Sequence, residues 1–292
     1  MDDKPGPSSA ERKRKRVTET LHDSLAVAAT VAAAVDDVAT ADIDEDVDDD
    51  DDVLSLEKSL TFSDTLVALR MMRAQFPKLD KVSVLPFILR SQLYSSVKDR
   101  TQVDRDLETL KRDGVLRVFK LNTGQDDHAI MFLDDYIQQI DCVLKKMESN
   151  KEGDFAVFGW FKKHVIMSKL EPSISHQELW SLLSVGGRVK DNHISLLINA
   201  GVLIRQLIDQ SMYWFAIPNI GSILKGLSQG RKELLSFLNR RKYKEMMLAP
   251  LEKKRLRFSP LDVRFHLRDL IGSGHLRTVH TPSGLLVRAV KD

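Results

Sequence analysis

The pattern of apolar and polar positions changes character in the same way at three points along the chain. At each point, apolar residues at helical spacing give way to a glycine and then to an aliphatic, strand-like stretch. The three junctions read LKRDGVLRVFKL from Leu110, LINAGVLIRQL from Leu197 and LIGSGHLRTVH from Leu270. A glycine just past a helix commonly takes the left-handed conformation that stops it. We therefore predict that each junction ends a helix and starts a strand.

The residues around the first junction predict three helices and a hairpin. Apolar positions indicate a helix that ends near residues 76–77, a second over 85–97, and a third that Thr101 caps and that runs to the glycine. Two strand patterns follow, over 115–121 and 128–132, around a polar turn at 122–127.

The same order of elements is predicted around the other two junctions. In the second repeat, helical patterns cover 154–169, 175–183 and 190–200, and strand patterns cover 202–208 and 213–217. In the third, a helical pattern over 222–248 has a possible break near Asn239, another covers 260–271, and strands cover 275–280 and 285–290.

Helices followed by a two-stranded hairpin are typical of the winged variant of the helix-turn-helix. A glycine after a helix is common in any α/β protein, but a short hairpin each time argues against a parallel βαβ fold. We predict an α+β protein with three tandem winged-helix domains at 58–136, 137–219 and 220–292, preceded by a disordered acidic N-terminal tail.

The tail, residues 1–57, contains 6 Lys/Arg and 17 Asp/Glu, so its net charge is −11, and the remainder of the chain carries +13. It holds no aromatic residue, and a segment of this composition cannot bury enough apolar surface to fold. The acidic run at 36–52 either aids solubility or competes with an anionic ligand. A compact basic cluster fits nuclear import, or else is a solvated charge run: Arg12, Lys13, Arg14, Lys15 and Arg16.

The composition narrows the class of protein. A single cysteine, Cys142, excludes an intramolecular disulfide framework and a cysteine-based zinc site. No apolar run reaches the roughly 18 residues that span a bilayer, so we expect a soluble intracellular protein without a membrane partner.

The strongest basic concentration lies between Lys225 and Arg257, where eleven Lys/Arg face three Glu. Such a surface repels itself unless an anion is near, so it fits a phosphate-binding stripe for double-stranded DNA better than a solvated face. No predicted third helix carries the constellation of Arg with Asn or Gln that would specify a base sequence, so we expect contacts to shape or backbone.

Motifs of enzymes are missing from the sequence. There is no GxGxxG or GxxxxGK[ST] loop and no kinase catalytic loop, and the His residues show no metal-binding spacing. We predict no catalytic residue, no metal site and no cofactor.

Residues 85–136, together with INAGVL, YWFAIP, RKYKEMML and FHLRDLIGSG, resemble the serine/threonine-protein kinase 19 family over nearly all of 60–292. The resemblance implies three winged-helix domains, a nuclear location and no kinase fold. It also implies a role in transcription-coupled nucleotide excision repair, bridging a stalled RNA polymerase II complex to TFIIH.

The resemblance places DNA contacts at Arg100, Lys225, Lys242 and Lys253, while a further basic position falls on Asn239 here, with Arg240 or Arg241 as neighbours. These positions and further cations of the basic stretch between Lys225 and Arg257 make up the predicted DNA-binding set: Arg100, Lys225, Arg231, Arg240, Arg241, Lys242, Lys253, Lys254 and Arg255. Two alternatives stay open: a protein kinase, as the family name says, or a docking module that binds protein and no DNA. The chain is also a possible homodimer.

Overall fold

The structure, a computed structural model, describes residues 63–79, 83–124, 127–149 and 153–290. All of them belong to one compact unit, 59–292. The predicted tail, its basic cluster and its acidic run lie outside the described residues.

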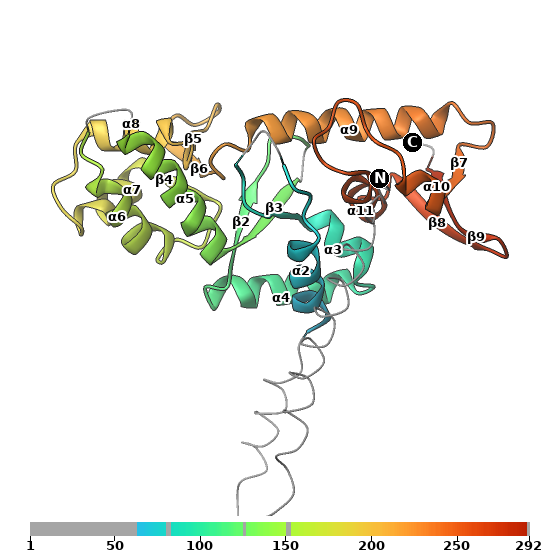
Figure 1. The fold of residues 1–292 in the computed structure, drawn as a ribbon. Coiled ribbons are helices and arrows are strands. Elements are labelled where there is room, and N and C mark those ends of the chain that lie inside the picture. The colour runs from blue at the N-terminus through green and yellow to red at the C-terminus, as the bar shows by residue number, and fades with distance from the viewer. Residues whose placement is uncertain (1–62, 80–82, 125–126, 150–152, 291–292) are drawn as a thin grey trace, which may run out of the picture. The chain divides into compact units, whose positions relative to one another are not determined.

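The chain forms mixed helices and small antiparallel sheets in three successive repeats (Figure 1). The first repeat consists of α2 (Asp64–Ala74), β1 (Ile88–Leu89), α3 (Arg90–Ser96), α4 (Arg100–Arg112), β2 (Leu116–Lys120) and β3 (His128–Phe132). Its strands pair in the order β1-β3-β2, with Val118 opposite Ile130 in the hairpin.

The second repeat follows a linking helix, α5 (Leu133–Glu148). It consists of α6 (Ala156–Trp160) with a π-helical continuation η1 (Phe161–Ile166), β4 (Ser173–Ser175), α7 (His176–Ser184), α8 (Asp191–Asn199), β5 (Leu203–Arg205) and β6 (Met212–Phe215). The strand order, β4-β6-β5, is that of the first sheet.

The third repeat begins with the longest described helix. It consists of α9 (Gly221–Asn239), β7 (Glu245–Met247), α10 (Leu248–Glu252), α11 (Val263–Gly272), β8 (Leu276–Thr281) and β9 (Gly284–Ala289). Its sheet again has the order β7-β9-β8, so one topology occurs three times.

The three glycines of the sequence pattern adopt the predicted left-handed conformation. Their φ angles are 69° at Gly114, 74° at Gly201 and 84° at Gly274. At Gly114 the helix end closes with two bonds, from the Gly114 amide to the Lys111 carbonyl and from the Val115 amide to the Leu110 carbonyl. This is the pairing of a Schellman motif, and Gly201 repeats it. The prediction that a helix ends and a strand begins at each junction is confirmed at all three positions.

Two predicted helices are wrong in part. Residues 85–97 do not form one helix, because Ile88 and Leu89 pair with β3 and the helix begins only at Arg90. Residues 240–247 are not helical, since α9 ends at Asn239 and 245–247 pair with β9. In both places a few residues join a sheet edge whose partner lies far along the chain, which a local periodicity does not reveal.

A third correction concerns the cap of α4. Asp99, rather than Thr101, is the N-cap, and its carboxylate accepts hydrogen bonds from the Thr101 and Gln102 amides. The helix α5 was not predicted at all. Its buried positions, Tyr136, Gln139, Ile140 and Val143, recur at helical spacing, and acidic residues open it while Lys145 and Lys146 close it.

The core does not divide cleanly between repeats. The first and third repeats each hold an aliphatic cluster of their own, but one large cluster extends from β2 and α5 through the second repeat to Ile223 and Phe265. The Tyr136 hydroxyl donates to the carbonyl of Ala216, and the fully buried rings of Phe119 and Tyr136 meet edge to face at 4.7 Å. The second repeat therefore folds against the first.

Two observations concern membrane spanning and metal binding. No helix in the described part of the chain is long and apolar enough to cross a bilayer. Within those same residues, no group of three or more His, Cys, Asp or Glu side chains could hold a metal ion.

The third junction gives a test of backbone conformation alone. A Cβ at Gly274 would meet nothing within 4 Å, so Gly274→Ala carries only the strain of a left-handed backbone. We expect it to lower the free energy of unfolding by about 1 kcal/mol, measured by urea denaturation. Gly159→Ala is the matched control, since its Cβ also meets nothing but lies within α6. It should be neutral or stabilising by up to about 1 kcal/mol, and an equal loss in both variants would contradict the prediction.

Candidate nucleic-acid interface

The basic surface of the third repeat starts on α9. One face of this helix is buried through Ile223, Leu227, Leu234 and Leu238. Lys225 and Lys232 of this helix and its C-cap residue, Arg240, are exposed and are separated by seven and eight residues, which places them on another common face. At the rise of an α-helix this line of cations extends over roughly 22 Å. Phosphates along a duplex backbone could meet it at several points.

The turn after α9 presents the next group of cations. Arg240, Arg241 and Lys242 are all exposed there, and Lys244 takes a positive φ of 53° as the chain turns into β7. The Arg241 guanidinium lies 5.0 Å from the Phe237 ring centroid, and the Lys242 ammonium lies 5.3 Å from that of Tyr243. Aromatic faces thus orient cations without neutralising them.

The segment after α10 also lies beside α9. Lys253, Lys254 and Arg255 are exposed, and the Lys254 ammonium is 4.2 Å from the Phe237 ring centroid. The Glu233 carboxylate on α9 holds this segment in place, because it accepts hydrogen bonds from the amides of Arg257 and Phe258. The Phe237 ring is therefore in contact with Arg241 from the turn after α9 and with Lys254 from the segment after α10.

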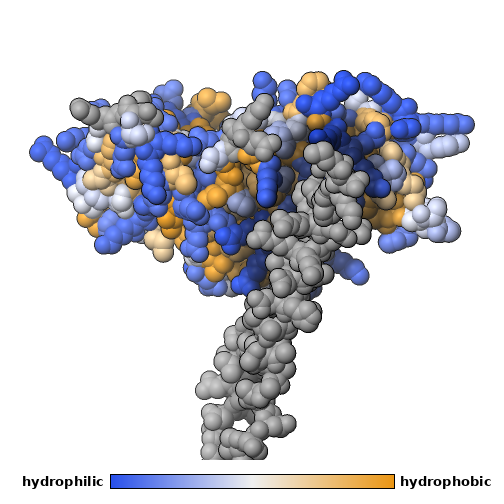
Figure 2. Space-filling model, in the orientation of Figure 1, coloured by the Kyte–Doolittle hydropathy of each residue, from blue (hydrophilic) through white to orange (hydrophobic). Residues whose placement is uncertain are grey.

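Between these elements lies a groove of about 870 Å³, which we call the basic groove. Five of its lining residues are cations: Lys232, Arg240, Lys254, Arg255 and Arg257. Glu233 is the one acidic residue of the lining, and it is occupied by backbone amides. Figure 2 shows hydrophilic residues gathered over the end of α9 and the turn that follows. The groove therefore offers an excess of positive charge to an anion.

Arg100, far away in the sequence, lies at the edge of the same surface. Its guanidinium donates to the Gly272 carbonyl at 3.0 Å and lies 5.1 Å from the Tyr94 ring centroid. A second hollow, of about 710 Å³, is lined by Arg90 and Arg100 together with Lys232. Since Lys232 lines both hollows, the structure brings Arg100 of the first repeat to the cations of the third.

Arg231 differs from the other members of the predicted set. Its guanidinium is paired with Asp127 of the first repeat at 2.6 Å and with Asp269 of α11 at 2.6 Å, and its side chain is only 16% exposed. Burial opposes ionisation of Asp127, but hydrogen bonds from Arg231 and Thr123 outweigh it and hold the pKa of that carboxyl below its usual range. Arg231 therefore joins parts of the fold, and its role as a DNA contact stays a prediction.

The third helix of this repeat, α11, is covered. Seven of its ten residues are buried, and α3 of the first repeat packs against it so closely that a Cβ at Gly272 would come within 1.6 Å of the Ser91 carbonyl oxygen. α11 therefore cannot lie in a major groove. The exposed residues of α8 carry no cation: Asp191, Asn192, Ser195 and Asn199. The basic surface consists of α9 and two connecting segments instead.

Sequence reasoning missed the residues that shape this surface. Phe237, Glu233 and Tyr94 carry no positive charge, yet they orient or anchor the cations around them. The spacing of Glu233 and Phe237, one helical turn apart on a basic helix, is a weak signal that could have indicated them.

A buried histidine fixes α11 to α9 beneath the basic surface. A Cβ at Gly230 would lie 2.4 Å from the His266 ring, so α9 and α11 are in close contact there. The ring nitrogen Nε2 pairs with the Ser259 hydroxyl at 2.8 Å. His266 is fully buried, and burial lowers its pKa to about 4.

Comparisons with known proteins give matches along most of the chain. The family model described as inactive serine-threonine protein kinase 19 matches residues 51–289. A human protein named winged helix repair factor 1 is 34% identical over 210 residues, which are 70% of this chain and 76% of that protein. A protein of the same name from Xenopus laevis is 32% identical, over 74% of this chain and 79% of that protein. Another from Dictyostelium discoideum is 27% identical, over 82% of this chain and 68% of that protein.

The ion pairs of Arg231 should contribute strongly to stability. Arg231→Met leaves the fully buried Asp269 and the half-buried Asp127 without their cation, so we expect the free energy of unfolding to fall by about 3 kcal/mol in urea denaturation. The control is Arg288→Met, which breaks the pair of Arg288, 55% exposed, with Glu245 and should cost less than about 1 kcal/mol. Similar losses in the two variants would rule out this role.

The low pKa of His266 makes stability depend on pH. The unfolded chain takes up this proton near pH 6.5 and the folded chain only near pH 4, so stability is lost as the pH falls between these values. From about pH 7.5 to about pH 5, the wild type should lose about 2 kcal/mol more than His266→Gln, by urea denaturation at each pH. All other titrating groups are common to both proteins, and parallel pH curves would refute the prediction.

Proposed function

Because the chain belongs to the inactive serine-threonine protein kinase 19 family, we propose that it is a non-enzymatic, repair-related winged-helix factor that binds double-stranded DNA in the nucleus. The name of the curated relatives, winged helix repair factor 1, supports repair and the winged helix. The observation that carries DNA binding is the basic groove with its continuation to Arg100.

Each repeat is proposed to be one winged-helix module, with modules at 58–136, 137–219 and 220–292. Two features support this: the hairpin that follows each third helix, and the common strand order of the three sheets. The third module binds DNA by an unusual face, because its third helix is covered by the first module. The cations of α9 and of the segments after α9 and α10 contact phosphates instead, which favours backbone contacts over base readout.

The wider role that we propose is that of an adaptor in transcription-coupled nucleotide excision repair. In this role the third module holds DNA, and the other modules hold proteins of the stalled RNA polymerase II complex and TFIIH. The basic cluster at 12–16 serves nuclear import, and self-association into a homodimer is part of the same proposal. The name of the curated relatives, winged helix repair factor 1, supports the repair part of this role.

The alternatives are less well supported. The family model is described as inactive, and the sequence holds none of the loops that bind and transfer phosphate, so we do not favour a protein kinase. A docking module without DNA binding leaves the excess of exposed cations around the basic groove unexplained.

If the basic surface binds DNA, the loss of DNA affinity in a variant should depend on which surface carries the substitutions and not on the net charge. Changing Lys225, Arg240, Lys253 and Arg255 to Glu should weaken binding of duplex DNA by at least roughly 10³-fold in fluorescence anisotropy, because several phosphate contacts turn repulsive. These four side chains are exposed, so circular dichroism should be unchanged.

The matched control changes the same number of exposed cations on the second repeat and α5 to Glu: Lys145, Lys163, Arg188 and Lys190. It produces the same net charge and should lose far less affinity. Equal losses would show attraction by net charge alone, and unchanged binding in the first variant would eliminate the basic groove as the DNA site.

A further inference from the structure

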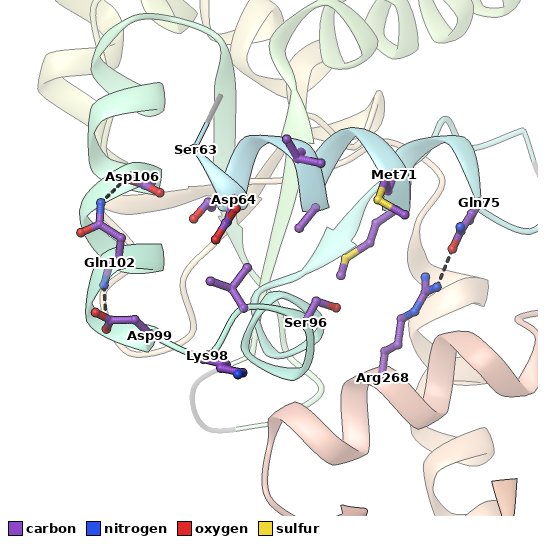
Figure 3. Close-up of a pocket in the computed structure, with 15 residues that line it drawn as sticks. Ser63, Asp64, Met71, Gln75, Ser96, Lys98, Asp99, Gln102, Asp106 and Arg268 are labelled. Atoms are coloured by element: carbon purple, nitrogen blue, oxygen red, sulfur yellow. Dashed lines mark hydrogen bonds between the residues drawn. The ribbon is translucent and has the colours of Figure 1, made fainter. Parts of the chain in front are cut away.

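A second groove lies in the first repeat, away from the basic groove. It is bounded by α2, by the link from α3 to α4, and by the first turns of α4, and it has a volume of about 770 Å³ (Figure 3). Arg268 of α11 closes one end, where it donates a hydrogen bond to the side chain of Gln75. The basic groove and this α2–α4 groove share no lining residue, so they are separate sites.

The floor of the α2–α4 groove is apolar. Val67 is 42% exposed and Met71 is 56% exposed, which is unusual for large hydrophobic side chains of a folded unit. They stand one turn apart on α2 and therefore form one ridge, beside Ala68 and Val97 of the same lining. A ridge of this kind suits the apolar stripe of a helix laid along it.

Two polar atoms in the groove have no hydrogen-bond partner among the described residues. The Thr65 hydroxyl is fully buried and unpaired, and the Oδ2 atom of Asp106 is likewise buried without a donor. The other carboxylate oxygen of Asp106 accepts from Gln102. Because buried polar atoms are normally paired, the free oxygen of Asp106, a half-buried residue of the lining, indicates a ligand that brings a donor to it.

The rim of the groove is more acidic than the rest of a body that carries net positive charge. Asp64, Asp99 and Asp106 line it against Lys98 and Arg268, and the Arg268 guanidinium is turned to Gln75. Asp64 and Asp99 are exposed. Their negative charge would attract a cationic side chain and would repel the phosphates that the basic groove attracts.

From the apolar ridge, the unpaired oxygen of Asp106 and the acidic rim, we propose that the α2–α4 groove docks a basic amphipathic helix of a protein partner. The apolar stripe of the helix packs on Val67 and Met71. A Lys or Arg beside that stripe donates to the free oxygen of Asp106, with further cations near Asp64 and Asp99. This gives the protein a docking site for protein that works independently of its DNA surface.

The test uses the full chain and a synthetic helical peptide of about 16 residues, with Leu at positions i, i+3, i+4 and i+7 and Lys on both flanks. A matched peptide carries Gln in place of each Lys. Fluorescence anisotropy should show binding of the Lys peptide that is roughly tenfold tighter than that of the Gln peptide, because three carboxylates are matched.

Variants of the protein locate the site. Val67→Ser with Met71→Ser should weaken the Lys peptide at least roughly tenfold, while Leu207→Ser with Ile208→Ser, which removes even more exposed apolar side chains, should leave it unchanged. Asp64→Asn with Asp106→Asn should reduce the preference for Lys over Gln, because only Asp99 of the three carboxylates then remains. Duplex DNA should bind all three variants as it binds the wild type.

Three results would overturn the proposal: no binding of the Lys peptide, equal binding of the two peptides, or equal loss in the α2 and control variants. Loss of DNA binding by the Glu variants of the basic groove, with peptide binding retained, supports both sites. Retained DNA binding there would refute the proposed DNA surface and leave the docking site standing.

Discussion

The Arg231 guanidinium, held between two carboxylates, is the interaction on which the arrangement of the first and third repeats depends. Its Nε atom donates to Asp269 on α11, and Nη1 donates to Asp127 at the tip of the first hairpin. Asp269 is fully buried and also accepts from the Ser91 hydroxyl of α3. A buried carboxylate is tolerated only when it is paired, so these contacts require α3, α9, α11 and the hairpin tip to meet in one way.

This constraint determines which surface is available to DNA. Because α3 lies against α11, the helix that would enter a major groove in a typical winged helix is used to join two repeats. The cations of the proposed surface are on the outer face of α9 and on two short segments that Glu233 and Phe237 hold beside it. The proposed DNA surface is therefore a consequence of how the repeats pack, and so is its preference for phosphates over bases.

Local features of the fold could be predicted from the sequence, and non-local ones could not. The glycines at 114, 201 and 274 and the hairpins after them follow from backbone preferences within a few residues. The short strands β1 and β7 depend on partners roughly 40 residues away, so 88–89 and 245–247 were mistaken for helix. The candidate site shows the same limit, since Arg231 counts as one more cation in the sequence until Asp127, 104 residues away, is seen to pair with it.

The helix α11 also connects the two proposed binding surfaces. On one side, Asp269 and His266 fix it to α9, beneath the basic groove. On the other, Arg268 reaches across to Gln75 at the end of the α2–α4 groove. Arg268 is two positions from His266 and one from Asp269, and residues at these spacings point in different directions, so one buried helix supports an electropositive surface and an acid-rimmed one. Surfaces of opposite charge are thereby kept apart, and a nucleic acid and a basic protein segment could be held together without competing for the same side chains.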